Sequence, residues 1–179
     1  AAGGNTGSAV NVIDYVTIAS EGNASDFGDL SSTSQEGTGT GSSTRGLFQL
    51  GLATDNVNTI EYVTIASTGN ATDFGDRTTT AAYGQDSAVS SPTRGVFSGG
   101  YISSSVNIID YVTIASTGNA TDFGDTSVTR YGMGGASSAT RGVFGGGNTS
   151  GDTMDYITIA STGNASDFGK LTNSPRYIS

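Results

Sequence analysis

The stretch Asp110-Tyr-Val-Thr-Ile-Ala-Ser-Thr-Gly-Asn-Ala-Thr-Asp-Phe-Gly-Asp125 decides the fold, because the chain contains it four times with few changes. The other copies begin at Asp14, Glu61 and Asp155, which gives a repeat of about 47 residues. A separate block, Thr-Arg-Gly-Val/Leu-Phe, recurs once in each of the last three units. Such a period indicates a protein built from stacked copies of one supersecondary unit.

Each unit reads as four short strands separated by Gly, Ser and Asn. In the second unit we expect strands near Thr33–Ser43, Arg45–Leu50, Thr59–Ser67 and Asp73–Thr78. The third of these carries apolar side chains on both faces, which is typical of a strand buried on two sides. No apolar stripe of helical period is present, so the sequence predicts an all-β chain.

We expect one repeat domain over residues 1–179, with units at about 1–30, 31–78, 79–127 and 128–179. Stacked four-stranded units bury both faces of every sheet, and a β-propeller achieves this radially. The first unit lacks its first strand and most of its second, and Arg176–Ser179 is too short to replace both. An open or strand-swapped β-repeat array, completed by a neighbouring chain, is therefore the alternative.

Composition argues against several classes of function. The chain has 16 acidic and 7 basic residues and a net charge of −9, so it lacks the basic footprint of a nucleic-acid-binding protein. It contains no apolar run that would insert into a membrane. It also has no Cys and no His, which removes thiolate ligands and the commonest general base. We predict no catalytic residue, no cofactor and no enzymatic activity.

The fourth unit resembles a kelch repeat. The resemblance rests on Arg130, on Arg141-Gly-Val-Phe-Gly-Gly-Gly147, on Thr153-Met-Asp-Tyr-Ile-Thr158 and on Asp167-Phe168. It implies a kelch-like β-propeller of about four repeats, each with four short antiparallel strands. In that family a Gly-Gly pair ends the second strand and a Tyr occupies the third, whereas the usual Trp of the fourth strand is Phe in this chain.

The amino-acid sequence of the repeat also resembles repeats in large structural proteins of marine bacteriophages and cyanophages. This likeness implies a virion or extracellular location, for example in a tail or head fibre. It implies other virion or filament proteins as partners, self-association, and a host-surface glycan or protein as a possible ligand.

The repeated aromatic and charged residues are expected to be structural. Each repeated Phe should be buried between neighbouring blades. The repeated Arg should pair with the acids that begin each third strand, or alternatively form a ring that binds an anion at the propeller mouth. These structural residues are Phe27, Phe74, Phe123, Phe168, Tyr15, Tyr62, Tyr111, Tyr156, Arg45, Arg94 and Arg141.

The segment after each third strand carries oxygen-bearing side chains three residues apart. Such oxygens could hold Ca²⁺, although Asn and Asp also build turns by accepting hydrogen bonds from nearby amides, and we favour the turn. No metal site is predicted. The weak calcium candidates are Asn70, Asp73, Asp76, Asn119, Asp122 and Asp125.

The units differ most in Gln35–Gly41, Tyr83–Ser91 and Tyr131–Ser138, which are the candidates for ligand contact. The leading hypothesis is a non-catalytic structural or binding module that attaches to a host surface or decorates a particle. The alternative is a fibre-forming repeat protein that completes blades between subunits. A carbohydrate-active enzyme with paired carboxylates is a third hypothesis, but the acids repeat with the fold and no pair is unique.

Overall fold

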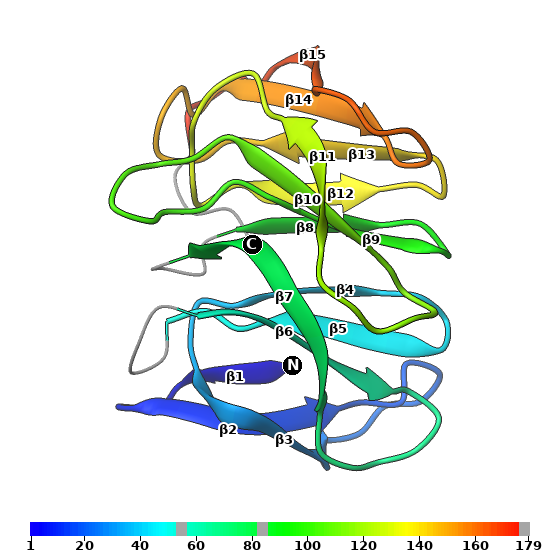
Figure 1. Ribbon diagram of the computed structural model, residues 1–179. Coiled ribbons are helices and arrows are strands. Elements are labelled where there is room, and N and C mark those ends of the chain that lie inside the picture. The colour runs from blue at the N-terminus through cyan, green and yellow to red at the C-terminus, as the bar shows by residue number, and fades with distance from the viewer. Residues whose placement is uncertain (53–56, 82–85, 176–179) are drawn as a thin grey trace.

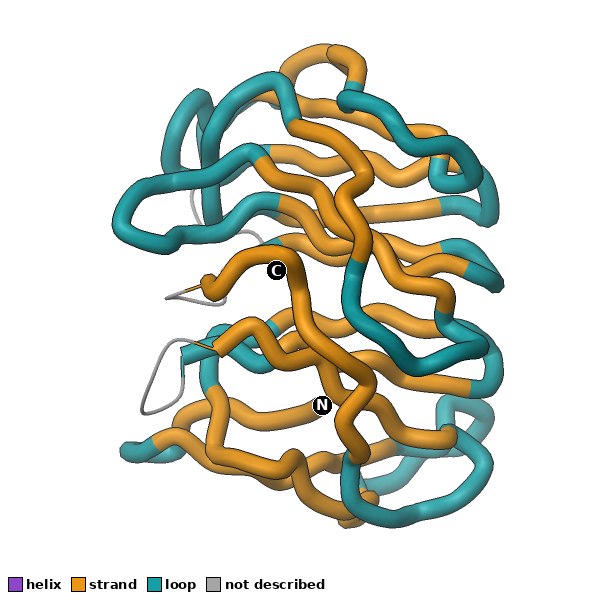
Figure 2. Tube along the Cα trace, viewed as in Figure 1, coloured by secondary structure: helices purple, strands orange, loops and turns teal. Residues whose placement is uncertain are grey.

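The computed structural model describes residues 1–52, 57–81 and 86–175, and all their regular elements are β-strands. Figure 1 shows these strands stacked in layers from the blue N-terminal end to the red C-terminal end. Figure 2 traces the same path as strands joined by loops. The all-β prediction is confirmed for this part of the chain. No helix in the described ranges is long and apolar enough to cross a membrane.

Each layer is an antiparallel sheet whose strands follow one another in chain order. Sheet 1 has three strands, and sheets 2, 3 and 4 have four each. The strands of sheet 1 are β1 (Ala2–Asn5), β2 (Ala9–Tyr15) and β3 (Ser25–Ser34). Those of sheet 2 are β4 (Thr38–Gly41), β5 (Arg45–Gln49), β6 (Val57–Thr64) and β7 (Thr72–Ala81). Those of sheet 3 are β8 (Ser87–Ser90), β9 (Arg94–Ser98), β10 (Ile108–Thr113) and β11 (Thr121–Asp125). Those of sheet 4 are β12 (Gly134–Ser137), β13 (Arg141–Gly145), β14 (Thr153–Thr158) and β15 (Ser166–Lys170).

The strands expected in the second unit agree with β5, β6 and β7 apart from their ends. The expected strand Thr33–Ser43 is wrong, because it joins the end of β3 to the start of β4. Glu36, between them, has a φ of 60°, a turn conformation that a strand cannot contain. The expectation that the third strand is buried on both faces is confirmed, since Ile60 and Glu61 are 0% and 1% exposed.

A β-bulge explains why Asp-Phe-Gly recurs in every unit. In sheet 2, Ile60 pairs with Gly75 and Glu61 pairs with Asp73, so Phe74 between them has no partner on β6. Gly75 follows with a φ of 141°, which side-chain-bearing residues rarely adopt. Phe74 is 2% exposed and packs in the core between sheets 2 and 3. The same break in register occurs where β3, β11 and β15 pair with their neighbours.

The hydrophobic core consists of three clusters, one between each pair of consecutive sheets. The cluster between sheets 2 and 3 contains Leu47, Ile60, Phe74, Phe97, Val112 and Ile114. The cluster between sheets 3 and 4 includes Val96, Ile109, Phe123, Phe144 and Ile159, and the one between sheets 1 and 2 includes Ile13, Phe27 and Val63. Because both faces of an inner sheet contribute to a core cluster, each unit depends on its neighbours for part of its stability.

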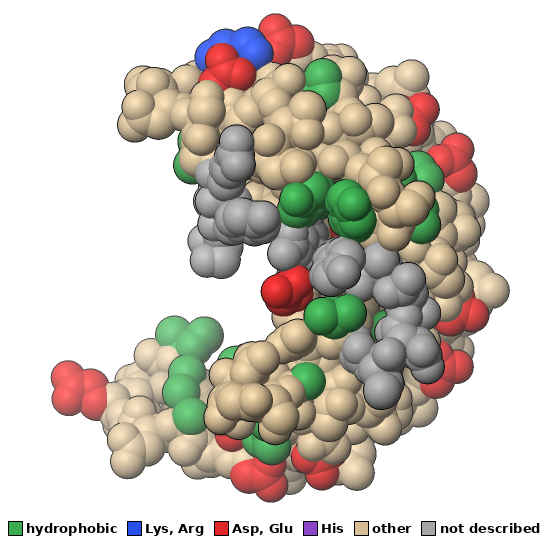
Figure 3. All heavy atoms as spheres, turned by 90° about the vertical axis from the view of Figure 1, so that its left-hand side faces the viewer, with side chains coloured by type: hydrophobic (Ala, Val, Ile, Leu, Met, Phe, Trp, Pro, Cys, Tyr) green, Lys and Arg blue, Asp and Glu red, His purple; other side chains and the backbone are tan. Residues whose placement is uncertain are grey.

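The four sheets form a crescent whose two ends are sheets 1 and 4. Figure 3 shows the described residues curving around a hollow that opens to one side. Three of the four repeated phenylalanines are buried as expected, but Phe168 is 48% exposed. The expectation of burial is wrong for Phe168 because, among the described residues, no sheet packs against sheet 4 on that side.

Candidate functional site

The turn between the third and fourth strands of each unit is bonded to the sheet before it. Between sheets 2 and 3, the Gly118 amide donates to the Phe74 carbonyl and the Ala120 amide to the Asp76 carbonyl, both at 2.7 Å. In return, the Asp76 amide donates to the Asn119 Oδ1 atom at 3.1 Å. The same three bonds join Gly69-Asn70-Ala71 to sheet 1 and Gly163-Asn164-Ala165 to sheet 3. We call this set of three bonds the asparagine bridge.

The bridge requires two backbones to touch. A Cβ atom placed on Gly75 would lie 2.5 Å from the carbonyl carbon of Gly118, a separation that real Cβ atoms do not show. Gly28 lies as close to Gly69, and Gly124 to Gly163. The glycine after each bulged Phe is thus needed for close approach as well as for its positive φ.

The repeated arginines bind the next sheet through backbone carbonyls. The Arg45 Nη1 atom donates to the Ile114 carbonyl at 2.8 Å, and the Arg94 Nη1 atom donates to the Ile159 carbonyl at 3.0 Å. Each guanidinium also lies over the repeated tyrosine of its own sheet, with Arg45 4.5 Å from the centre of the Tyr62 ring. Arg94 and Arg141 stack in the same way on Tyr111 and Tyr156.

Each repeated tyrosine in turn packs edge-on against the bulged phenylalanine of its sheet. The ring centroids of Tyr62 and Phe74 are 5.8 Å apart, at an interplanar angle of 85°. The other three Tyr–Phe pairs have centroid distances between 5.8 and 6.0 Å. The repeated Arg, Tyr and Phe therefore form one stack in each of the last three units, and Tyr15 and Phe27 form the same pair in the first unit without an arginine, which supports their assignment as structural residues.

The expected ion pairs between the repeated arginines and acids are wrong. Asp110 and Asp155, both fully buried, pair instead with Arg77, which sequence reasoning did not single out, and with Arg130, which it named only as part of the kelch-like pattern. The Arg77 Nε atom is 3.0 Å from Asp110, and Arg130 Nη2 is 2.6 Å from Asp155. Glu61 accepts two bonds from the Ser31 amide. The physical reason is direction, because the acids face the preceding sheet whereas the repeated arginines face the following one.

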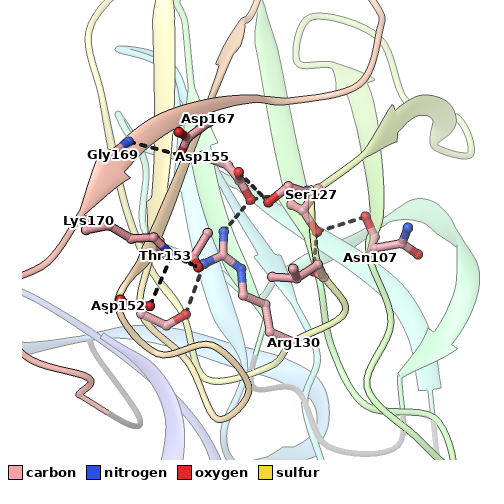
Figure 4. Close-up of polar contacts among 12 residues, drawn as sticks. Asn107, Ser127, Arg130, Asp152, Thr153, Asp155, Asp167, Gly169 and Lys170 are labelled. Carbon is pink, nitrogen blue, oxygen red and sulfur yellow. Dashed lines mark hydrogen bonds and ion pairs between the residues drawn. The ribbon is translucent and has the colours of Figure 1, made fainter.

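Figure 4 shows how Arg130 ties sheet 3 to sheet 4. Its Nη1 atom donates to the Thr153 carbonyl at 2.6 Å, while Nη2 reaches Asp155. Asp155 also accepts a hydrogen bond of 2.7 Å from the Ser127 hydroxyl. Burial of the guanidinium lowers the pKa of Arg130, an effect that Asp155 opposes. The Arg130 and Asp155 side chains are fully buried, so this ion pair offers nothing to a ligand.

A second buried cluster places two carboxylates on one guanidinium. The Arg77 Nη1 atom is 2.5 Å from Asp86, and its Nε atom contacts Asp110. Burial raises the pKa of Asp86 to about 6; the charge of Arg77 opposes this shift and that of Asp110 adds to it. Asp86 Oδ1 has no hydrogen-bond partner among the described residues. The Arg77–Asp86 pair joins β7 of sheet 2 to the residue just before β8 of sheet 3.

Some of the side-chain oxygens that were weak calcium candidates accept hydrogen bonds from backbone amides instead. Asn70 and Asn119 accept amide hydrogens of the preceding sheet, as described above. Asp73 accepts from the Gly75 amide at 3.1 Å, which is the local turn that the sequence favoured. No group of three or more acidic residues in the described ranges could hold a metal ion. Among the described residues, none donates a hydrogen bond to the side-chain carboxylate of Asp76, Asp122 or Asp125 that would fix a role for it.

The antiparallel order divides the loops between the two ends of the strands, which lie on opposite sides of the crescent. The turns between first and second strands and between third and fourth strands lie at one end, which we call the constant end because their sequences repeat. The loops between second and third strands, and the connections between sheets, lie at the opposite, variable end. Figure 3 looks onto the variable end.

The three variable stretches differ in how much surface they present. In Tyr83–Ser91, residues 83–85 lie outside the described residues, and β8 is packed between β4 and β12, with Ser87 and Val89 each 2% exposed. The described part of this stretch is therefore buried or half-buried and presents little surface for ligand contact. In Gln35–Gly41 and Tyr131–Ser138, residues 36–37 and 135–138 are exposed.

An aromatic pair that sequence reasoning missed lies at the variable end. Tyr101, in the loop between β9 and β10, packs edge-on against Tyr131, with ring centroids 5.2 Å apart. Tyr131 precedes β12 and opens one of the variable stretches. Both side chains are half-buried. The signal in the sequence was weak, because the corresponding loops of the other units contain no tyrosine.

A hollow of about 250 Å³ lies beside sheet 1, where the other sheets have a first strand. It is lined by Ala1 and Ala2 at the N-terminal end, by Leu30, and by Phe48 and Gln49 of β5, among others. Gln49 is 1% exposed, and its Oε1 atom has no partner among the described residues. The edge of β1 next to this hollow carries unpaired backbone groups.

No protein-family profile matches this chain, and a search of curated proteins finds no significant relative.

Proposed function

We propose that this chain is a non-catalytic structural and binding module of a virion or another extracellular assembly, and that its sheets are blades of a kelch-like β-propeller. One observation carries the proposal. The repeated Asn, Arg and acidic residues are largely used to join one sheet to the next. A chain whose recurring polar groups hold its own units together has the design of a scaffold rather than of an enzyme.

The binding surface in this proposal is the variable end. Loops that differ between units on a rigid repeat scaffold are the usual place for recognition. The Tyr101–Tyr131 pair supplies aromatic faces there, and such faces stack on the apolar faces of sugar rings. A net charge of −9 disfavours an anionic ligand. The ligand class that fits best is a neutral glycan on a host surface.

The test is retention of the fluorescently labelled chain on intact marine cyanobacterial cells and on their isolated surface polysaccharide. We expect saturable binding by the wild-type chain and a loss of at least about tenfold in affinity for the double variant Tyr101→Ala, Tyr131→Ala. Thr117→Ala, an exposed change at the constant end, is the matched control and should bind like wild type. Equal binding by all three proteins, or none by any, would contradict attachment through the variable end.

A second function, fibre formation by strand exchange, is favoured by the hollow beside sheet 1. In that case a first strand from a neighbouring chain pairs with β1 and fills the hollow. A peptide with the sequence of residues 134–144 should then bind and protect the amides of Ala2–Asn5 from exchange. If those amides exchange equally with and without the peptide, strand addition does not occur at this edge. The expected role of Arg176–Ser179 in this pairing lies outside the described residues.

A further inference from the structure

The start of sheet 1 presents one half of an interface that occurs three times inside the chain. Ile114 and Ile159, which follow the third strands of sheets 3 and 4, are 2% and 0% exposed because a four-stranded preceding sheet covers them. Ile65, whose preceding sheet 1 has three strands and no repeated arginine, is 49% exposed. Their counterpart Ile18 is 98% exposed. Asn23, the counterpart of the bridging asparagines, is exposed, and no hydrogen bond joins its side chain to a described residue. We call this surface, with Asp14, the head.

The end of sheet 4 presents the other half. Phe168 is 48% exposed, and a Cβ atom placed on Gly169 would meet only the flexible end of Met154, at 3.9 Å. Gly75 and its counterparts touch another backbone at this position. Val143 and Met154 are half-buried, although the residues in the same places of sheet 3 are 0% exposed. We call this surface, with Arg141, the tail.

Arg141 shows what the tail lacks. Its guanidinium stacks on Tyr156 at 4.6 Å, just as Arg45 and Arg94 stack on their own tyrosines. Those two arginines also donate to the carbonyl of an isoleucine in the next sheet, at 2.8 and 3.0 Å. No such bond joins Arg141 to a residue in the described ranges. Its donor is oriented by the stack and is ready for a carbonyl beyond sheet 4.

We propose that the tail of one chain binds the head of a second copy, so that sheet 4 and the partner's sheet 1 repeat the internal interface. The asparagine bridge then forms between chains, from the partner's Gly22 amide to the Phe168 carbonyl and from the Lys170 amide to the partner's Asn23. Arg141 donates to the partner's Ile18 carbonyl, and the Ile18 side chain fills the space beside Phe168. The inference rests on the proposed structural role and specifies its partner.

We assign the tail's partner as a second copy of the chain because the hydrogen-bonding groups of the head and the tail are complementary. Donors on one surface correspond to acceptors on the other, in the arrangement that the chain uses three times internally. Asp14 continues this pattern, since Glu61, Asp110 and Asp155 each accept a hydrogen bond from the sheet before them. Thr172 of the tail occupies the place of Thr78, which donates to Asp110. The head and tail are different surfaces, so association yields a ring or an open filament.

The experiment measures sedimentation of the wild-type chain and of two blocked variants from about 1 μM to about 1 mM, where interfaces of modest size dissociate. Ile18→Asp blocks the head, and Arg141→Glu blocks the tail. Both positions are exposed, and the melting temperature of each variant should equal that of the wild type at low concentration. We expect the wild-type mass to rise with concentration, whereas each variant alone stays at the monomer mass of 17.9 kDa.

Mixing the two variants gives the decisive result. One intact tail and one intact head remain in the mixture, so a one-to-one dimer should form and grow no further. Thr117→Asp, which adds an acid to an equivalent internal turn, is the control and should associate like wild type. A wild-type chain that stays monomeric throughout, a blocked variant that associates with itself, or a mixture that forms no dimer would each overturn the proposal.

The outcome is separable from that of the proposed attachment function. If the chain stays monomeric but still binds cells through the Tyr101–Tyr131 pair, the head-to-tail proposal is contradicted and the attachment proposal is not. If the chain assembles as expected but binds no cell surface, the attachment proposal is contradicted and the head-to-tail proposal is not.

Discussion

The repeat supplies a matched pair of substitutions in which only burial differs. Ile114 and Ile18 are the same residue at the same place in their units, yet they are 2% and 98% exposed. Changing Ile114 to Ala deletes three carbon atoms from the cluster between sheets 2 and 3 while leaving intact the carbonyl that accepts from Arg45. The expected loss is about 3 kcal/mol of unfolding free energy, within the usual range for a buried isoleucine. Ile18→Ala should cost less than about 0.5 kcal/mol in the monomer.

Urea denaturation at low protein concentration, followed by far-UV circular dichroism and tyrosine fluorescence, measures both values. For a slope of about 2 kcal/mol per molar urea, Ile114→Ala should lower the midpoint by about 1.5 M, whereas Ile18→Ala should leave it nearly unchanged. Ile159→Ala, at a position with 0% exposure, should behave like Ile114→Ala. Equal midpoints for the Ile114 and Ile18 variants would refute the assignment of the inter-sheet core.

Three further predictions concern other parts of the interface. Phe74→Ala should cost about 3–5 kcal/mol, and Phe168→Ala clearly less, because Phe168 is already half-exposed; equal denaturation midpoints for the two variants would contradict this. Burial raises the pKa of Asp86 from 3.8 to about 6, so the folded chain binds this proton more tightly than the unfolded chain does. The resulting stabilisation is complete below the unfolded pKa and is lost as pH rises through about 6. Relative to Asp86→Asn, the wild type should therefore lose on the order of 3 kcal/mol between about pH 3 and pH 7, and parallel pH curves would disprove this. Removal of divalent cations with EDTA should leave the melting temperature unchanged, since Asn70 and Asn119 already accept backbone hydrogens; a drop that Ca²⁺ alone reverses would show a bound ion.

Much of the fold could be predicted because the repeat restates its pattern four times. The alternation of short apolar runs with Gly, Ser and Asn located β5, β6 and β7 correctly, and the two apolar faces of β6 indicated its burial. The error at Thr33–Ser43 arose because the change from one sheet to the next depends on the turn at Glu36, whose backbone conformation has no strong signature in Glu. Burial of Phe168 was also overestimated, because a repeated pattern does not show which unit lacks a neighbour.

The polar contacts were harder to predict, since they join residues far apart in sequence. Acids and arginines that recur together suggested ion pairs, but a period says nothing about which sheet a side chain faces. The true partners differ in position, since Arg77 lies within β7 whereas Arg130 lies after β11, so they do not recur at one place in the repeat. Similarly, the repeated Asn was interpreted as part of a local turn, whereas Asn119 binds Asp76 of the preceding sheet.

The central claim is that the repeated residues hold each sheet to the one before it, and amide hydrogen exchange resolved by residue tests it most directly. The amides of Gly69, Gly118 and Gly163 each donate to a phenylalanine carbonyl of the preceding sheet at 2.7 Å. Gly22 has the same place in sheet 1 but no preceding sheet. At concentrations where the chain is monomeric, the first three amides should exchange slowly, by cooperative opening, and Gly22 should exchange fast. Equal rates at all four glycines would contradict the account.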